Sequence, residues 1–240
     1  MKSKYTPGKP GWLRPGRVGF LCRIFLLSCV IGGLPLYAQT DAVFRSPLGA
    51  ENRARFNEIC AALSGYPVIK GTFEQTKTLS RLNRSLVSRG NFIIARDLGM
   101  VWETLKPFPS TLSAGRDYLL QSTPSGVKTR LDAKGNETFL RFADTISAVF
   151  SGNSQKLQDN FEVYFTATAK GWILGLIPSE RAIRSFAERI ILSGDALRDG
   201  TVIRTVLLYE KNGDSIYYAL SDHRFPDSLS LHERSLFVLR

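Results

Sequence analysis

The hydrophobic residues of this chain follow two different spacings, which predict helices separated by runs of β-strands. One stripe recurs every three or four positions and consists of Phe56, Ile59, Cys60 and Leu63. We expect its helix to start at Ser46-Pro47, a capping residue followed by a proline suited to the first turn, and to end near Gly65. A second helix is predicted over residues 138–151, with the stripe Phe139, Phe142, Ala143, Ile146, Val149 and Phe150. Residues 153–160 are expected to add a further helical turn or two.

Between and after these helices, short segments rich in β-branched and aromatic residues are punctuated by glycine and proline. This spacing predicts an antiparallel meander from Val68 to about Arg130. After the second helix we expect strands at 161–168, 172–177, 186–192, 202–209 and 215–220, with Asn212-Gly213 as a tight hairpin turn. Residues 228–239 are expected to supply a last strand.

Several of the predicted strands are apolar on both faces, as in 161–165 and 172–177. An antiparallel sheet with one face in water should instead alternate between apolar and polar residues. Two arrangements explain the difference. Either the sheet lies inside a large core, or one face lines a hydrophobic chamber that the amphipathic helices cover.

The N-terminus has the features of a secretory signal peptide. Basic residues without any acid are followed by the apolar run Ile24–Leu36 and by Ala38, after which we expect cleavage. The run is too short to span a bilayer, which needs about 20 residues. A lipobox-like segment ending at Cys29 is the alternative processing site. We therefore divide the chain into a signal peptide, 1–38, and one exported domain, 39–240, which begins with a short mobile lead over 39–45.

Removal of residues 1–38 changes what the composition implies. The exported part keeps 26 of the 32 basic residues and all 21 acidic ones, a formal net charge of +5, which is too low to indicate nucleic-acid binding. Cys60 is the one cysteine left, so no intrachain disulfide can form, and a hydrophobic core must provide the stability. We expect a monomer.

Nothing in the sequence indicates catalysis or a metal. His223 and His232 are the only histidines, and no cysteine or spaced carboxylate set accompanies them. There is no Gly-x-Ser-x-Gly elbow and no glycine-rich phosphate loop before a helix. Cys60 lies within an apolar stripe, where a buried structural thiol is expected. We predict a non-enzymatic protein without a cofactor.

Strand parity places Phe92, Ile94 and Arg96 on one face, and Met100 and Trp102 on one face of the following strand. An arginine at the end of an apolar strand face is most often a solvated strand terminus. It can also serve as a cationic donor at the rim of a chamber, bonded to helix carbonyls or to a ligand head group.

Three further motifs stand out along the strands. The first is Lys70-Gly71-Thr72-Phe73-Glu74-Gln75, the second extends from Gly90 to Trp102, and the third from Gly171 to Pro178. They resemble motifs of the outer-membrane lipoprotein carrier (LolA-like) family. Their order and spacing match the family over most of the exported chain. The resemblance implies an α+β fold in which an open antiparallel half-barrel sheet is covered by a lid of α-helices.

The resemblance also implies a function and a site. It predicts a periplasmic carrier that shields the acyl chains of lipoproteins, or of another lipid, and carries them from an inner-membrane exporter to an outer-membrane acceptor. Arg96 matches the arginine that holds the family's lid closed, and Met100 and Trp102 match chamber positions. We therefore place the ligand-binding chamber at Phe92, Ile94, Arg96, Met100, Trp102, Phe142, Ile146, Phe150 and Trp172.

One departure concerns the strongest of these positions. The family commonly has proline after this arginine, whereas Asp97 follows here, where it could pair with Arg96 and weaken its hold on the lid. The sequence therefore leaves open whether the cargo is a lipoprotein or another lipid. Two further readings are a periplasmic sensor of lipid or lipoprotein with the same fold, and a lipid-processing enzyme.

Overall fold

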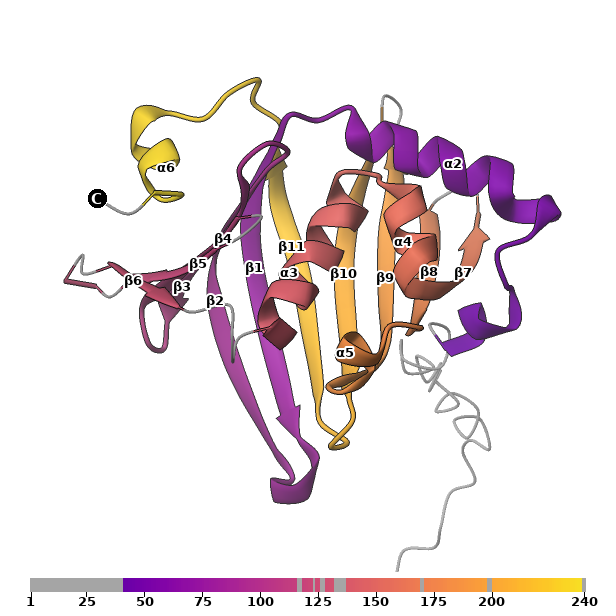
Figure 1. Ribbon diagram of the computed structural model, residues 1–240, viewed down its shortest axis with the longest axis horizontal. Coiled ribbons are helices and arrows are strands. Elements are labelled where there is room, and N and C mark those ends of the chain that lie inside the picture. Colours follow the sequence, from indigo (N-terminus) through magenta and orange to yellow (C-terminus); the bar gives the residue numbers. More distant parts are fainter. Residues whose placement is uncertain are drawn as a thin grey trace, which may run out of the picture. The chain divides into compact units, whose positions relative to one another are not determined.

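Two meanders join edge to edge into one antiparallel sheet (Figure 1). The computed structural model describes residues 41–115, 118–122, 124–125, 128–131, 137–168, 171–197 and 200–238, so the predicted signal peptide lies outside the described residues. The first meander contains β1 (Val68–Leu79), β2 (Arg84–Ala95), β3 (Gly99–Lys106), β4 (Ser110–Ala114), β5 (Leu119–Ser122) and β6 (Lys128–Leu131). The second contains β7 (Phe161–Ala167), β8 (Gly171–Pro178), β9 (Ala187–Leu197), β10 (Gly200–Glu210) and β11 (Ser215–Arg224).

The meanders meet where β1 pairs with β11, in the order β6-β5-β4-β3-β2-β1-β11-β10-β9-β8-β7. In the described residues, β6 and β7 are thus the outer strands, and the sheet is open. The helices α3 (Glu137–Phe150) and α4 (Ser154–Asn160) lie between β6 and β7 in the sequence. The chain therefore has to return from one outer edge of the sheet to the other, and these helices cover one face on the way.

The helix α2 (Ala50–Ser64) completes this cover (Figure 1). It contacts β7 and β10, α4 contacts β7, and α3 contacts α2, α4 and β3. Below, the helix face is the side of the sheet toward α2, α3 and α4, and the back face is the opposite side. The predicted fold class, an open antiparallel sheet covered by helices, is confirmed. The described helices include none that is long and apolar enough to cross a membrane.

The back face is covered by the two ends of the described chain. At the C-terminal end, Leu229 and Phe237 pack on Val68, Ile93 and Val101. The segment between them forms α6 (Leu231–Ser235). The prediction of a last strand over 228–239 is therefore wrong. The reason is a capping box, in which the Ser230 and Glu233 side chains each bond the other residue's backbone N–H and start a helix.

At the other end, residues 41–45 form the 3₁₀ helix η1 (Asp41–Arg45) rather than a mobile lead. Val43 is buried and lies over Gly175, where an added β-carbon would come within 2.8 Å of its side chain. Residues 46–48 then pair with the outer strand β7: Leu48 N–H donates to the Val163 carbonyl at 2.8 Å. This pairing covers an otherwise open strand edge. It also delays the start of α2 to Ala50, with Gly49 rather than Ser46 as its N-cap.

Candidate functional site

The β2–β3 hairpin gathers four of the predicted site residues on the helix face. Phe92 lies opposite Trp102, and Ile94 lies opposite Met100. Phe92, Ile94 and Met100 are buried, while Trp102 is partly buried and stacks on Phe73 with ring centroids 4.3 Å apart. The parity expected from the sequence is therefore confirmed for these four side chains, which form one apolar surface.

Two glycines of the quoted motifs allow this surface to form. A β-carbon at Gly71 would come within 2.7 Å of the Phe92 ring, and one at Gly90 would lie 1.8 Å from the Glu103 carbonyl oxygen. Any larger residue would have to displace an aromatic side chain or the neighbouring strand. Glycine is therefore required at these two positions because it lets the aromatic side chains lie close to the backbone.

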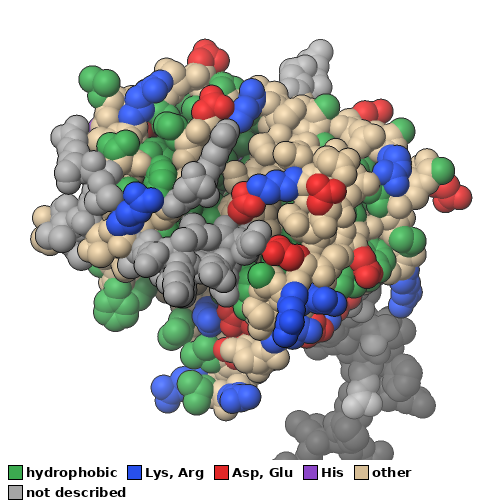
Figure 2. All heavy atoms as spheres, viewed as in Figure 1, with side chains coloured by type: hydrophobic (Ala, Val, Ile, Leu, Met, Phe, Trp, Pro, Cys, Tyr) green, Lys and Arg blue, Asp and Glu red, His purple; other side chains and the backbone are tan. Residues whose placement is uncertain are grey.

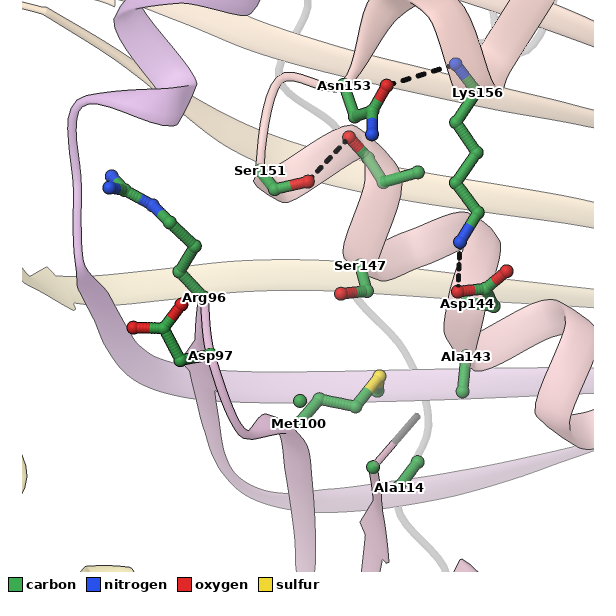
Figure 3. A pocket seen from close by; sticks show the side chains of 13 residues that line it. Arg96, Asp97, Met100, Ala114, Ala143, Asp144, Ser147, Ser151, Asn153 and Lys156 are labelled. Carbon is green, nitrogen blue, oxygen red and sulfur yellow. Dashed lines mark hydrogen bonds and ion pairs between the residues drawn. The ribbon is translucent and has the colours of Figure 1, made fainter. Parts of the chain in front are cut away.

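Arg96 directly follows β2 and lies at the C-terminal end of α2 (Figure 3). Its Nη2 donates to the carbonyl of Ser64, the last residue of that helix, and its backbone N–H donates to the Pro67 carbonyl at 3.1 Å. A cation at a helix C-terminus also meets the negative end of the helix dipole. Both Arg96 and Asp97 are exposed, and no ion pair joins them within the described residues. The expected pairing with Asp97 is thus replaced by a bond to α2.

The remaining predicted site residues, which lie on α3 and β8, do not belong to the β2–β3 hairpin. Phe150, in the last turn of α3, is buried with its ring centroid 6.3 Å from that of Phe92. Trp172 on β8 is buried as well, and its Nε1 donates to Thr201 Oγ1 at 2.7 Å. Phe142 and Ile146 belong to α3, but their side chains lie outside the described residues.

Under α2 the helix face is densely packed. Phe56 of α2 meets Phe165 of β7 edge to face with centroids 5.5 Å apart. The apolar space here, between α2, α3, α4 and strands β7 and β8, is only about 10 Å³. Cys60 lies in this region, where burial raises the pKa of its thiol to about 12, so the thiolate is scarce at neutral pH. The expectation of a buried structural thiol is confirmed.

Beside this packed region lies a cavity of about 720 Å³ (Figure 3). It lies between the turn after β2, the facing parts of β3 and β4, and the helices α3 and α4. Its lining is mixed: Arg96, Asp97, Gly99, Met100, Ala114, Gly115, Ala143, Asp144, Ser147, Ala148, Ser151, Asn153 and Lys156. Of the predicted site residues, Arg96 and Met100 reach it. The other predicted residues whose side chains are described do not line the cavity and belong to the hydrophobic core cluster or pack against it: Phe92, Ile94, Trp102, Phe150 and Trp172.

The helix side of this cavity was not predicted from the sequence. Lys156 forms an ion pair with Asp144, and its backbone N–H donates to Asn153 Oδ1 at 3.0 Å, which caps α4. These residues occupy polar positions of amphipathic helices, and such positions usually face solvent. Their spacing in the sequence therefore did not indicate a cavity. In the part of the chain that the structure describes, no three His, Cys, Asp or Glu side chains come together as metal ligands would.

No protein-family profile and no curated protein matches the chain by sequence. Similar folds are nevertheless found among solved structures. A LolA superfamily protein from Nitrosomonas europaea is 8% identical with a TM-score of 0.43, over 78% of this chain and 97% of that one. A domain described for outer membrane lipoprotein sorting, from Vibrio parahaemolyticus, is 12% identical with a TM-score of 0.42, over 82% and 100%.

A third structure is the MucA/MucB complex from Pseudomonas aeruginosa, 10% identical with a TM-score of 0.41, over 77% of this chain and 60% of that one. The first of these structures bears the family name that the sequence motifs suggested. At such identities and TM-scores the likeness concerns the fold alone and carries no functional conclusion.

Proposed function

We propose that this protein is a non-enzymatic periplasmic carrier that shields acyl chains between the helix face and its covering helices. Its cargo would be the acyl chains of lipoproteins or of another lipid, taken from an inner-membrane exporter and delivered to an outer-membrane acceptor. The observation that carries the proposal is the large cavity beside the aromatic surface of β2 and β3, under helices joined to the outer edges of an open sheet.

The apolar surface supplies the affinity that such a carrier needs. Burying one methylene group is worth about 0.8 kcal/mol, so a chain of roughly 16 carbons represents about 12 kcal/mol before any cost. Separating the helices from the sheet and ordering the cargo offset part of this gain. A carrier has to release its cargo, and an offset of this kind keeps binding reversible.

Polar groups at the same place suit the start of an acyl chain. Trp102 Nε1 is buried and has no hydrogen-bond partner within the described residues, which leaves a donor within the apolar surface. An ester or amide carbonyl of the cargo would satisfy it. Ser147 and Arg96 line the neighbouring cavity, where they can meet the polar part of the same molecule.

Arg96 is proposed as the latch of the cover. Its bond to the Ser64 carbonyl is exposed and so holds the C-terminal end of α2 weakly enough to be exchanged. The N-terminal end is tied more firmly, since Asn52 Nδ2 donates to the Phe165 carbonyl at 2.9 Å and residues 46–48 pair with β7. Opening would therefore start at the Arg96 end, next to the cavity.

Titration with a fluorescent fatty acid tests the proposal. We expect saturable binding near one probe per protein and competition by a diacylated N-terminal lipoprotein peptide. Competition by phospholipid but not by the peptide would assign another lipid as the cargo of the same carrier. Absence of saturable binding of the fatty acid, the peptide and phospholipid alike would contradict the carrier. The sensor reading would then be pursued through protein partners.

A further inference from the structure

The β1–β2 hairpin projects beyond its neighbours on one side. The last residue pair between β2 and β3 joins Arg89 to Lys106, so residues 84–88 of β2 have no partner strand on that side within the described residues. Residues 80–87, here called the hairpin tip, include the short 3₁₀ helix η2 (Ser80–Leu82), and each of them is exposed. The tip is the projecting end of a two-stranded ribbon (Figure 1).

The side chains of the tip combine apolar and basic groups. Leu82, Leu86 and Val87 are 64%, 55% and 44% exposed, among the most exposed large hydrophobic residues of the described chain. Arg81 and Arg84 lie beside them and have no acidic partner within the described residues. Figure 2 shows basic and hydrophobic side chains together at this tip, at the lower end of the view.

The tip is held in place by the turn between β10 and β11. Ser80 N–H donates to Asp214 Oδ1 at 2.9 Å, and the Ser80 hydroxyl donates to the Gly213 carbonyl. These bonds engage the acidic groups nearby, since Asp214 also accepts from Asn212 and Glu210 pairs with Lys77 at 3.3 Å. The positive charge of the tip is therefore left without compensation, and it is presented on a fixed structure.

A simpler reading is that the arginines protect an open strand edge from pairing with other chains. That explains Arg84 but not three exposed aliphatic side chains next to it, because aliphatic residues favour such pairing. A protein partner is also less suited to this shape. A stable protein interface covers about 800 Å² on each side, whereas a projecting tip of eight residues offers few contacts. Insertion into a lipid surface needs only a few apolar side chains with basic residues around them.

We infer that the hairpin tip docks the protein on an anionic membrane surface. Leu82, Leu86 and Val87 enter the interfacial region, and Arg81 and Arg84 contact lipid phosphates. The docking surface is separate from the proposed chamber. The tip and Arg96 lie at opposite ends of β2, whose twelve residues span roughly 35–40 Å. A substitution in the tip can therefore abolish membrane docking without affecting acyl-chain binding, and a substitution in the chamber can do the reverse.

Vesicle sedimentation tests this inference on the protein purified after export. The vesicles contain phosphatidylcholine alone or with about one third phosphatidylglycerol. We expect binding to the anionic vesicles to fall roughly tenfold or more in R81Q/R84Q, since each basic residue near the surface contributes to binding. L82S/L86S should weaken binding at high and low salt alike, whereas the loss in R81Q/R84Q should be largest at low salt.

Two matched variants serve as controls. R181Q/R184Q removes the same charge from two exposed arginines of the helix α5 (Arg181–Arg184). Leu231→Ser removes a leucine of α6 that is 88% exposed, more than either leucine of the tip. Both should bind vesicles as the unchanged protein does. Equal losses in tip and control variants, or no binding of the unchanged protein to anionic vesicles, would overturn membrane docking. Fatty-acid binding in solution should be the same in all variants, so a failure of the chamber would be recognised separately.

Discussion

The two faces of the sheet are covered in different ways. On the back face, the C-terminal segment seals a small apolar cluster through Leu229 and Phe237, and an ion pair between Lys70 and Glu233 fixes it. On the helix face, α2, α3 and α4 cover a much larger apolar surface beside a cavity of about 720 Å³, and the proposed latch is the exposed Arg96 at the end of α2. The cover on the back face is thus fixed by an ion pair, whereas the helices on the other face are the cover that we propose to open.

The packed part of the helix face should dominate stability. Phe56→Ala removes a ring that is 1% exposed and packed against Phe165, and it leaves a void in a region with almost no free space. We expect a loss of about 3–5 kcal/mol in the free energy of unfolding, measured by denaturant titration. Phe108→Ala, at a ring that is 81% exposed, is the control and should change stability by less than about 0.5 kcal/mol. Similar losses in both variants would contradict the packing described here.

The cavity should tolerate a larger side chain that blocks cargo. Ser147 of α3 lines the cavity and is partly exposed, so Ser147→Trp fills space instead of displacing packed atoms (Figure 3). We expect fatty-acid affinity to fall about tenfold or more, equivalent to about 1.4 kcal/mol or above, with little change in stability. Ser185→Trp, on an exposed turn, is the control. Unchanged affinity in Ser147→Trp would mean that cargo does not enter this cavity.

The C-terminal segment that covers the back face should respond to pH through Glu233. The hydrogen bond from Lys70 holds the pKa of Glu233 at about 2, below its ordinary value of 4.5. A depressed carboxyl pKa stabilises the folded state above pH 4.5, and this contribution is lost as the pH falls toward 2. Because the pair is partly exposed, we expect about 1–2 kcal/mol.

We therefore expect Glu233→Gln to have a lower free energy of unfolding than the unchanged protein at pH 7. Its free energy of unfolding should also vary less between pH 5 and 2. Chemical denaturation at each pH measures both effects. Fatty-acid binding at pH 7 should not change. A loss of binding in this variant would mean that the two covers are coupled, contrary to the comparison.

The smallest expected effect concerns the latch. Replacing Arg96 by Leu removes an exposed charged hydrogen bond, worth about 1 kcal/mol, and should favour opening at the end of α2. Cys60, buried under α2, reports such opening through its rate of modification by a thiol reagent. We expect the rate to rise about fivefold, with Arg181→Leu as the control. An unchanged rate and unchanged lipid binding would exclude the latch.

Local patterns of the sequence predicted most of the fold. The helical stripe of α2 and the strand parity of β2 and β3 depend on contacts between near neighbours, and both are confirmed. The errors lie at the chain ends, where packing decides. Residues 46–48 pair with an outer strand instead of starting a helix, and a capping box turns the C-terminal segment into α6.

The site was predictable only in part. Phe92, Ile94, Met100 and Trp102 follow from strand periodicity, and Arg96 from the family resemblance. Asp144, Ser147 and Lys156 reach the cavity because the chain returns from β6 to β7 across the helix face, and this path depends on which strands become the outer ones. The hydrophobic pattern of a single sequence does not show which strands pair with each other, so it does not show which strands lie at the edges of the sheet.

Whether the protein carries an acyl chain can be measured by native mass spectrometry after purification from a bacterial periplasm without detergent. We expect a bound acyl species at close to one per protein, which solvent extraction would identify, and its loss in Ser147→Trp. A clean apo mass that persists after adding phospholipid or an acylated peptide would contradict the proposed carrier function. The helix cover would then be a fixed part of the core, like the cover on the back face.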